Sequence, residues 1–154
     1  MSNLSEKLDL PPVEQVGYVV RDLEATMALY APMFGPFSME PYEKISGPLY
    51  RGTPTDCELR IAYGKSGNLE MEFIQPVSGN GPHQEFLDQG REGIHHVRFR
   101  VKDCDGVIAK LKPHGYHPIW YHDLGFGKFS YLEHESRNGV LLELLELDDR
   151  DRPK

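Results

Sequence analysis

The stretch IHHVRFRVKDCDGVIAKLKPHGY (residues 94–116) decides the fold, because its pattern already occurs in VEQVGYVVRDLEATMALYAPMFG (13–35). In both copies an alternating strand leads into an aspartate, Asp22 or Asp103, that stands where a helix N-cap is expected. Apolar residues at helical spacing follow each aspartate. Each copy therefore predicts a strand followed by an amphipathic helix.

The two copies also end alike. NLEMEFIQP (68–76) resembles GVLLELLEL (139–147), and the alignment places Glu72 opposite Glu143. A glutamate inside a run as apolar as VLLELLEL is costly unless it is paired or bound to a cation. Both glutamates are therefore candidates for a buried polar site.

Two further strand-like runs, CELRIAYG (57–64) and FSYLEHES (129–136), lie between the start and the end of each copy. The pattern predicts an α+β fold in which the order βαβββ occurs twice and the two sheets curve toward each other. The predicted modules are 12–77 and 93–147, the linker with one short helix is 78–92, and the polar tails are 1–11 and 148–154.

Composition narrows the class of protein. The chain has 154 residues and a formal net charge of −7, which disfavours binding to nucleic acid or to an anionic membrane. It has no apolar run long enough for a membrane helix. Cys57 and Cys104 are too few for a disulfide framework. We expect a reduced, cytoplasmic protein that acts on a small molecule.

The alternation of strand side chains predicts a metal site. In each first strand the apolar series faces the helix, so Gln15 and His96 lie on the concave face and His95 lies on the other. Glu72 and Glu143 share the concave face. One imidazole, two carboxylates and one amide oxygen suit a divalent ion such as Zn, Ni, Co, Mn or Mg. A lone strand histidine is more often structural, but the repeat places all four donors at corresponding positions.

These segments resemble the vicinal oxygen chelate superfamily, which includes glyoxalase I, methylmalonyl-CoA epimerase, extradiol dioxygenases and bleomycin-resistance proteins. The resemblance covers residues 12–147, and GIHHVRFRVKDCDGVIAKLKPHGY, NGVLLELLEL and PHQEFLDQGREGIHH are most similar to the epimerase-like members. It implies one domain of paired βαβββ modules, whose curved sheet forms a cup around one divalent metal, and a homodimer. The four metal positions of the family correspond to Gln15, Glu72, His96 and Glu143.

The sequence also departs from these relatives. Epimerases usually have His and Gln at the first two metal positions, where this chain has Gln15 and Glu72. The set Gln, Glu, His, Glu is that of many zinc glyoxalases I, yet Val19 and Pro76 occupy the positions of glutathione-binding residues in those enzymes. Extradiol dioxygenases use a second His where this chain has Gln15, so oxygen chemistry is disfavoured.

The resemblance implies an isomerase or epimerase that removes a proton next to a carbonyl through a metal-stabilised enolate. Glu143 and Glu72 are the candidate bases, and Glu58 or Arg60 is the nearest candidate for a second proton-transfer group. A glyoxalase I-type lyase is one alternative, and a non-catalytic binding or resistance protein or a dioxygenase is another. Tyr131 is a further candidate for the rim of the cup, with plain packing as the alternative.

Arg98 and Arg100 follow His96 at alternate positions, so they share its face. A guanidinium there binds a carboxylate or a phosphate well, which favours a small anionic or acyl-CoA substrate. The alternative is an internal salt bridge to Glu70 or Glu72, because a buried arginine must be paired. Both interpretations remain open from the sequence.

Overall fold

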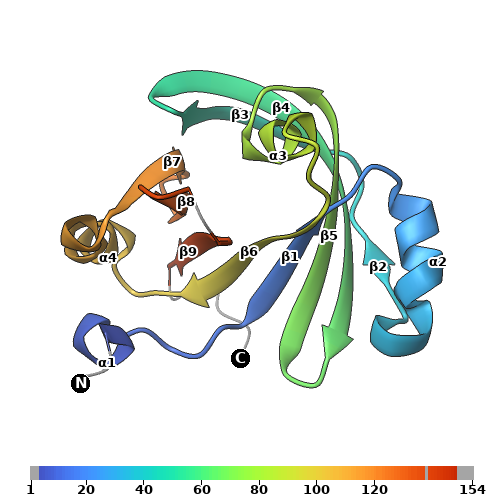
Figure 1. The fold of residues 1–154 in the computed structure, drawn as a ribbon, viewed down its shortest axis with the longest axis horizontal. Coiled ribbons are helices and arrows are strands. Elements are labelled where there is room, and N and C mark those ends of the chain that lie inside the picture. The colour runs from blue at the N-terminus through green and yellow to red at the C-terminus, as the bar shows by residue number, and fades with distance from the viewer. Residues whose placement is uncertain (1–3, 138, 149–154) are drawn as a thin grey trace.

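The computed structural model describes residues 4–137 and 139–148 and consists mainly of strands (Figure 1). Its first half contains α1 (Leu4–Leu8), β1 (Gln15–Val19), α2 (Leu23–Phe34), β2 (Ser38–Met39), β3 (Glu43–Tyr50), β4 (Thr53–Ser66) and β5 (Leu69–Gly79). The linker forms α3 (Pro82–Asp88). The second half contains β6 (Gly93–Arg100), α4 (Cys104–Leu111), a 3-10 turn (Lys112–His114), β7 (Tyr116–Asp123), β8 (Gly127–His134) and β9 (Leu141–Leu147). The predicted α+β class is confirmed.

The sheet closes into a barrel-like cup. Its strand order is β2-β4-β3-β7-β8-β9-β6-β1-β5, and β4 also pairs with β5, which completes the ring seen in Figure 1. The two modules meet twice within this chain, through antiparallel pairs between β1 and β6 and between β3 and β7. Closure leaves one set of strand faces pointing inward, where a site can be enclosed.

The helices α2 and α4 cover the outside of the barrel (Figure 1), as the apolar series of the strands before them predict. The side chain of Asp22 accepts a hydrogen bond from the backbone N–H of Ala25, and Asp103 does the same for Gly106. Both N-caps are therefore confirmed. Beneath α2, the aromatic rings of Tyr18 and Phe73 stack with their centroids 4.9 Å apart.

The N-terminal segment differs from the polar tail expected over residues 1–11. Residues 4–8 form α1, and Leu8 is buried against the outer core under α4, next to Val101 and Leu111. A leucine that can cover this apolar surface gives the segment a reason to fold back on the domain. Of the predicted C-terminal tail, residues 149–154 lie outside the described residues.

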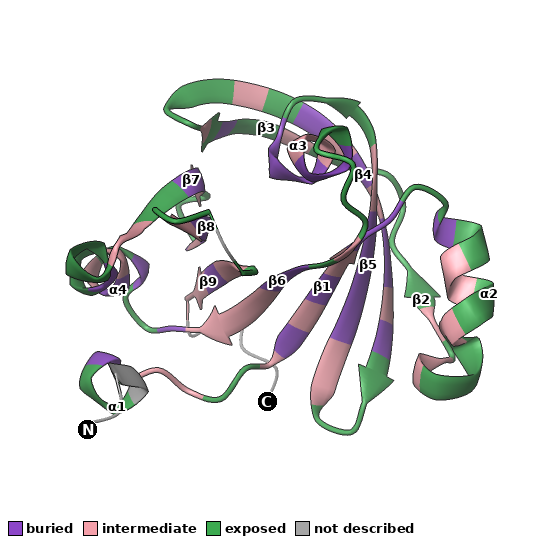
Figure 2. Ribbon diagram, viewed as in Figure 1, coloured by how far each residue is buried: buried purple, intermediate pink, exposed green. Residues whose placement is uncertain are grey.

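α3 packs into the interior at the end where β5 finishes and β6 begins (Figure 2). Pro82 stands at the start of the helix, a position that needs no backbone N–H. The helix buries His83, Phe86 and Leu87. Phe86 and Leu87 join an interior core that contains Trp120, so the helix closes this end of the barrel.

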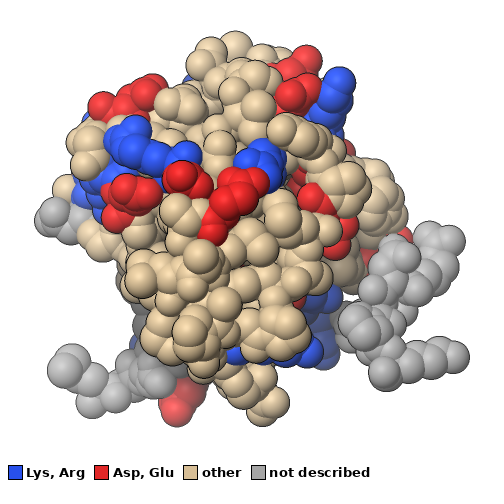
Figure 3. Space-filling view, turned by 90° about the vertical axis from the view of Figure 1, so that its right-hand side faces the viewer, with Lys and Arg blue, Asp and Glu red and all other residues tan. Residues whose placement is uncertain are grey.

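On the face that α2 covers, charged side chains cross the upper half, and the area below them is largely uncharged (Figure 3). Leu29, Met33 and Met39 are exposed on this side of the domain.

None of the helices in the described part of the chain combines the length and the apolar character that crossing a membrane requires.

Candidate active site

Four polar side chains meet inside the barrel, and they are the four that the sequence places on the concave face. Nε2 of His96 lies 3.1 Å from Oε1 of Gln15, 3.3 Å from Oε1 of Glu72 and 3.2 Å from Oε2 of Glu143. Gln15 and His96 are fully buried, and the two glutamates are almost so. The imidazole nitrogen therefore stands at the centre of three oxygens.

Strand register brings these groups together. β1 lies between β5, to which it is parallel, and β6, to which it is antiparallel. Gly17 is opposite both Glu72 and His96 in these pairings. A Cβ atom at Gly17 would lie 2.0 Å from Cε1 of His96, so the imidazole occupies the space that a side chain would need. A glycine at this position is a requirement of the site.

The prediction that His95 faces away from the site is wrong, and a β-bulge is the reason. Gly17 pairs with His96 whereas Tyr18 pairs with Ile94, so β6 has one extra residue here. A bulge breaks the alternation of side chains. His95 is consequently 2% exposed, and its Nδ1 lies 3.0 Å from Nδ1 of His96.

His95 therefore supports His96 from behind. Its Nε2 lies 3.4 Å from the carbonyl oxygen of Pro82, at the start of α3. The backbone carbonyl, His95 and His96 form a chain of polar contacts that leads from the helix to the site. Such contacts to the second nitrogen of an imidazole fix its ring orientation and its tautomer.

The charges around His96 favour its protonated form. Burial alone would lower the pKa of His96, but its contacts with Glu143 and Glu72 outweigh burial and raise the pKa to about 9. The imidazolium then neutralises one of two buried carboxylates. In this arrangement the groups bind one another, and no three or more described His, Cys, Asp or Glu side chains are placed to hold a metal ion.

A cavity with about 530 Å³ of empty space, part of it open to solvent, adjoins these groups. Its polar lining comprises Glu43, Glu72, His83, Arg98, Tyr131 and Glu143. Its apolar lining comprises Ile45, Leu59, Ile61, Tyr63, Ile74, Trp120, Phe129 and Leu145. A cavity of this size, in which apolar side chains surround a cluster of polar groups, is typical of a site for a small organic ligand.

Glu43 is a site residue that the sequence analysis missed. It begins β3 and lines the cavity together with Ile45, two residues further along the strand. Burial, with the charges of Glu72, Glu40 and Glu143, raises the pKa of Glu43. The segment that contains it has no clear apolar alternation, so its inward face was not apparent.

Glu58 and Arg60, the residues that the sequence analysis considered for a second proton-transfer group, lie away from the cavity. Glu58 pairs with Lys44 across β3 and β4, with 3.4 Å between Oε1 and Nζ. Arg60 pairs with Glu24 of α2. Glu43 is the carboxylate that shares the cavity with Glu72 and Glu143.

Arg98 lines the cavity but is held by two carboxylates. Its Nε donates to Oε1 of Glu14 at 2.8 Å, and one terminal nitrogen lies 3.5 Å from Oε1 of Glu70. Arg100 also donates to Glu14, at 3.1 Å, and is not part of the cavity lining. The ion pairs of Arg98 therefore include Glu70, which the sequence analysis named as a partner for an internal salt bridge, and Glu14, which it did not name.

Tyr131 and His83 form a hydrogen-bonded pair in the cavity wall. The hydroxyl oxygen of Tyr131 lies 3.0 Å from Nε2 of His83, and Tyr131 is 3% exposed. Burial, assisted by the charge of Glu143, raises the pKa of Tyr131 well above its usual value. Burial lowers the pKa of His83 to about 3. The pair is therefore a phenol and a neutral imidazole at physiological pH.

Comparison with known proteins identifies the family. Residues 14–131 match the Glyoxalase/Bleomycin resistance protein/Dioxygenase superfamily, and the chain belongs to it. The predicted membership in the vicinal oxygen chelate superfamily is thereby confirmed.

Among curated proteins, the mitochondrial methylmalonyl-CoA epimerase of Dictyostelium discoideum is 24% identical in an alignment of 161 positions that covers 95% of this chain and 84% of that protein. An uncharacterized Bacillus subtilis protein, YqjC, is 25% identical over 113 residues, which cover 68% of this chain and 79% of that one. A structure of a Streptomyces coelicolor methylmalonyl-CoA epimerase variant with 2-nitronate-propionyl-CoA has a TM-score of 0.64 and 21% identity, covering 94% of this chain and 99% of that one.

Proposed function

We propose that this chain is a metal-dependent epimerase or isomerase that removes a proton next to the carbonyl group of a small anionic or acyl-CoA substrate. The observation that carries the proposal is the convergence of Gln15, Glu72, His96 and Glu143 beside a cavity that also contains Glu43. Superfamily membership and the similarity to epimerases support this class of reaction.

The four donors are of the types that bind a divalent metal, and they would take it up by exchanging their contacts with one another for contacts with the ion. Ligands bound about 2.1 Å from a metal lie roughly 3.0–3.4 Å from one another at octahedral or tetrahedral angles. The distances from Nε2 of His96 to the oxygens of Gln15, Glu72 and Glu143 are 3.1, 3.3 and 3.2 Å. Oε2 of Glu143 is buried and accepts no hydrogen bond from the described residues, and its contact is the ion pair with His96. A bound divalent metal would replace the imidazole proton and supply Lewis-acid stabilisation of an enolate.

The glutamates supply the proton transfers. Glu143 lies beside His96 and is the base that we assign to removal of the α-proton. Glu43 shares the cavity and is the group that we assign to return of a proton from another side. The raised pKa of Glu43 brings this carboxyl closer to the range in which a side chain can both give up and accept a proton during catalysis. Two carboxylates in one cavity allow epimerisation of a single carbon.

The lining of the cavity favours a substrate with an apolar part and an acidic group. Apolar side chains make up most of the wall, and Arg98 is its cationic group within the described residues. Glu14 and Glu70 already contact Arg98, so a substrate carboxylate would compete with them or share the guanidinium. Acyl-CoA acids combine these features, and one related epimerase was solved with an acyl-CoA analogue.

Exchange of substrate hydrogen with solvent deuterium tests the proposal. The Co²⁺-loaded protein is incubated in D₂O with methylmalonyl-CoA and with a panel of other acyl-CoA acids, and incorporation is followed by mass spectrometry. We expect exchange in the wild type, and a decrease of roughly 100-fold or more in Glu143→Gln, because the amide cannot accept the proton. Glu43→Gln should slow inversion of configuration more than exchange.

Glu58→Gln is the matched control, because Glu58 is also a strand glutamate but pairs with Lys44 away from the cavity. Its exchange rate should equal that of the wild type. Equal rates in Glu143→Gln and the wild type would exclude Glu143 as the base. Exchange only with hemithioacetals, and with none of the acyl-CoA acids, would replace the epimerase proposal with a glyoxalase-type lyase.

A further inference from the structure

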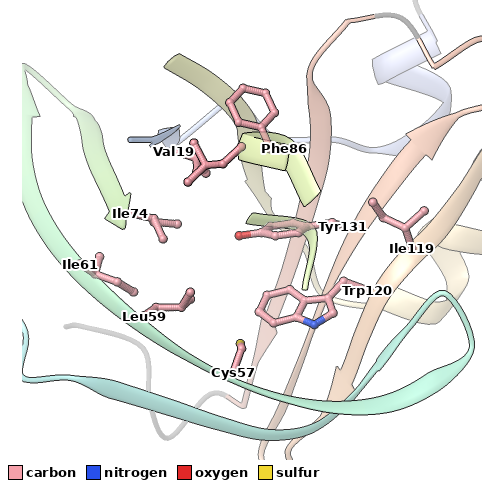
Figure 4. Packing of buried hydrophobic residues seen from close by; sticks show 10 residues of the cluster. Val19, Cys57, Leu59, Ile61, Ile74, Phe86, Ile119, Trp120 and Tyr131 are labelled. Carbon is pink, nitrogen blue, oxygen red and sulfur yellow. The ribbon is translucent and has the colours of Figure 1, made fainter. Parts of the chain in front are cut away.

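The pair formed by Tyr131 and His83 lies beside the proposed metal ligands and is not explained by metal binding. Tyr131 is opposite Glu143 in the pairing of β8 with β9, and its ring centroid lies 4.9 Å from that of His96. His83 reaches Tyr131 from α3. The hydroxyl of Tyr131 points from its strand into the interior, towards the side on which Ile74 lies (Figure 4).

Packing alone does not require these polar groups. The buried side chains around Tyr131 in the interior core are mostly apolar, Ile61, Ile74 and Trp120 among them. Phenylalanine would fill the volume of the tyrosine ring without burying a hydroxyl, whose burial is unfavourable unless it is hydrogen-bonded. The imidazole of His83 has the same cost, and its Nδ1 has no hydrogen-bond partner among the described residues.

That unpartnered Nδ1 determines the direction of the hydrogen bond. If Tyr131 donated to Nε2, the neutral His83 would carry its hydrogen on Nδ1, as a buried donor without an acceptor. If Nε2–H donates to the tyrosine oxygen instead, Nδ1 is a bare acceptor. Buried unpaired donors are rarer than acceptors that are not fully used. Either direction leaves one hydrogen of the pair without a partner in the protein, but the phenol hydrogen of Tyr131 can face the cavity, where water or a ligand can accept it, whereas Nδ1 of His83 is buried. The second arrangement is therefore favoured, and it leaves the phenol hydrogen of Tyr131 free to point into the cavity.

We propose that Tyr131 is a catalytic residue that donates a hydrogen bond to the substrate oxygen on which negative charge develops, and that His83 is the residue that positions it. This inference rests on the proposed enolate chemistry and deepens it. The donor is preorganised, because the strand holds the ring and the histidine holds the oxygen, and preorganised donors stabilise oxyanions effectively in enclosed sites. The substrate oxygen must then lie between the metal ligands and β8.

The tautomer of His83 gives the first test and needs neither a metal nor a substrate. Nitrogen NMR of the histidine rings in the metal-free protein should show His83 with its hydrogen on Nε2. In Tyr131→Phe the Nε2 resonance should shift, because its acceptor is removed, while the exposed His114 stays unchanged. A hydrogen on Nδ1 would overturn the inference, because Tyr131 would then be donating to the histidine.

Oxalate gives the second test, because it is a planar dianion with adjacent oxygens, like a chelated enolate. Calorimetric titration into the Co²⁺-loaded protein should show binding that is roughly 10- to 100-fold weaker in Tyr131→Phe, as expected for loss of a hydrogen bond to a charged group. Co²⁺ affinity should not change. His83→Phe should weaken oxalate binding less, and His83→Gln should restore it, because the glutamine amide can donate from a similar position.

Tyr121→Phe is the matched control, since Tyr121 lies on the neighbouring strand β7, donates its hydroxyl hydrogen to Asp105 and is not part of the cavity lining. Oxalate binding that is unchanged in Tyr131→Phe, equally weak in Tyr121→Phe, or absent from the Co²⁺-loaded wild type would overturn the inference. If no acyl-CoA acid exchanges its proton but both tests succeed, the proposed epimerase function fails while Tyr131 stands as a donor to a chelated anion.

Discussion

β1 and β6 begin the two modules and pair with each other, yet they build the site in different ways. β1 keeps a regular alternation and contributes Gln15 and the empty space above Gly17. β6 is bulged and turns both His95 and His96 into the interior. In the first copy of the repeat Gly17 has no side chain, and the imidazole of His96 from the second copy fills the space that this leaves. The site therefore depends on the difference between the copies as much as on their similarity.

Gly17→Ala should have the largest effect, because it removes this difference. The new Cβ would lie 2.0 Å from Cε1 of His96, so the ring must move. We expect Co²⁺ affinity to fall roughly 100-fold or more. Overpacking should lower the free energy of unfolding by about 1–3 kcal/mol. Calorimetric titration with Co²⁺ and urea unfolding of the metal-free protein measure the two effects.

Gly81→Ala is the control for this substitution. The nearest atom to a Cβ at Gly81 is Sγ of Cys57, at 4.0 Å, which is ordinary contact. Both metal affinity and stability should stay close to wild type. A Gly17→Ala protein that binds Co²⁺ as tightly as the wild type would show that His96 does not need the space above β1.

His95→Phe tests the contribution of the bulge. It keeps a ring of similar shape but removes the nitrogen that lies 3.0 Å from Nδ1 of His96. Loss of such a supporting contact typically weakens metal binding by about 10–100-fold. Co²⁺ titration should show this decrease, with partial recovery in His95→Asn, which places a polar atom near the lost nitrogen. Ile94→Val, at the exposed residue of the same bulge, should leave the affinity unchanged.

The folded protein should lose stability in acid because of two buried histidines, His83 of α3 and His95 of β6. Their ring centroids lie 5.2 Å apart. Burial lowers the pKa of His83 to about 3, whereas an unfolded histidine has a pKa near 6.5. Between these values the unfolded chain binds more protons, so stability falls as the pH falls from 6.5 towards 3, by about 1.4 kcal/mol per pH unit for this group.

Urea unfolding of the wild type and of His83→Gln at several pH values measures this contribution. The difference in free energy of unfolding between the two should change with that slope below pH 6.5 and stay constant above it. His114→Gln, at an exposed position, should show no such change. A constant difference across the whole range would mean that His83 has the same pKa in the folded protein as in the unfolded chain.

The sequence predicted most of this arrangement, because alternation and repetition are local signals. The alternation of side chains along each strand placed Gln15, Glu72 and Glu143 on the inner face, and the structure has them there. The same rule failed at His95, because a bulge depends on how two strands pair and cannot be read from the sequence of one strand. Glu43 and His83 were missed for a related reason. Their roles arise from barrel closure and from the insertion of α3, which are long-range events.

The helix N-caps give the smallest expected effect and show where the two modules remain equivalent. Asp22 and Asp103 occupy corresponding positions, and each accepts a backbone N–H from the residue three further on. Replacing either by alanine should lower the free energy of unfolding by about 1 kcal/mol, and replacing it by asparagine by much less, because asparagine also caps helices well. Urea unfolding measures these losses, and Co²⁺ affinity should not change, because both caps lie outside the barrel. Similar losses would show that the copies diverged at the site and kept their folding signals, whereas a loss in metal affinity would show that the outer helices and the inner site are coupled.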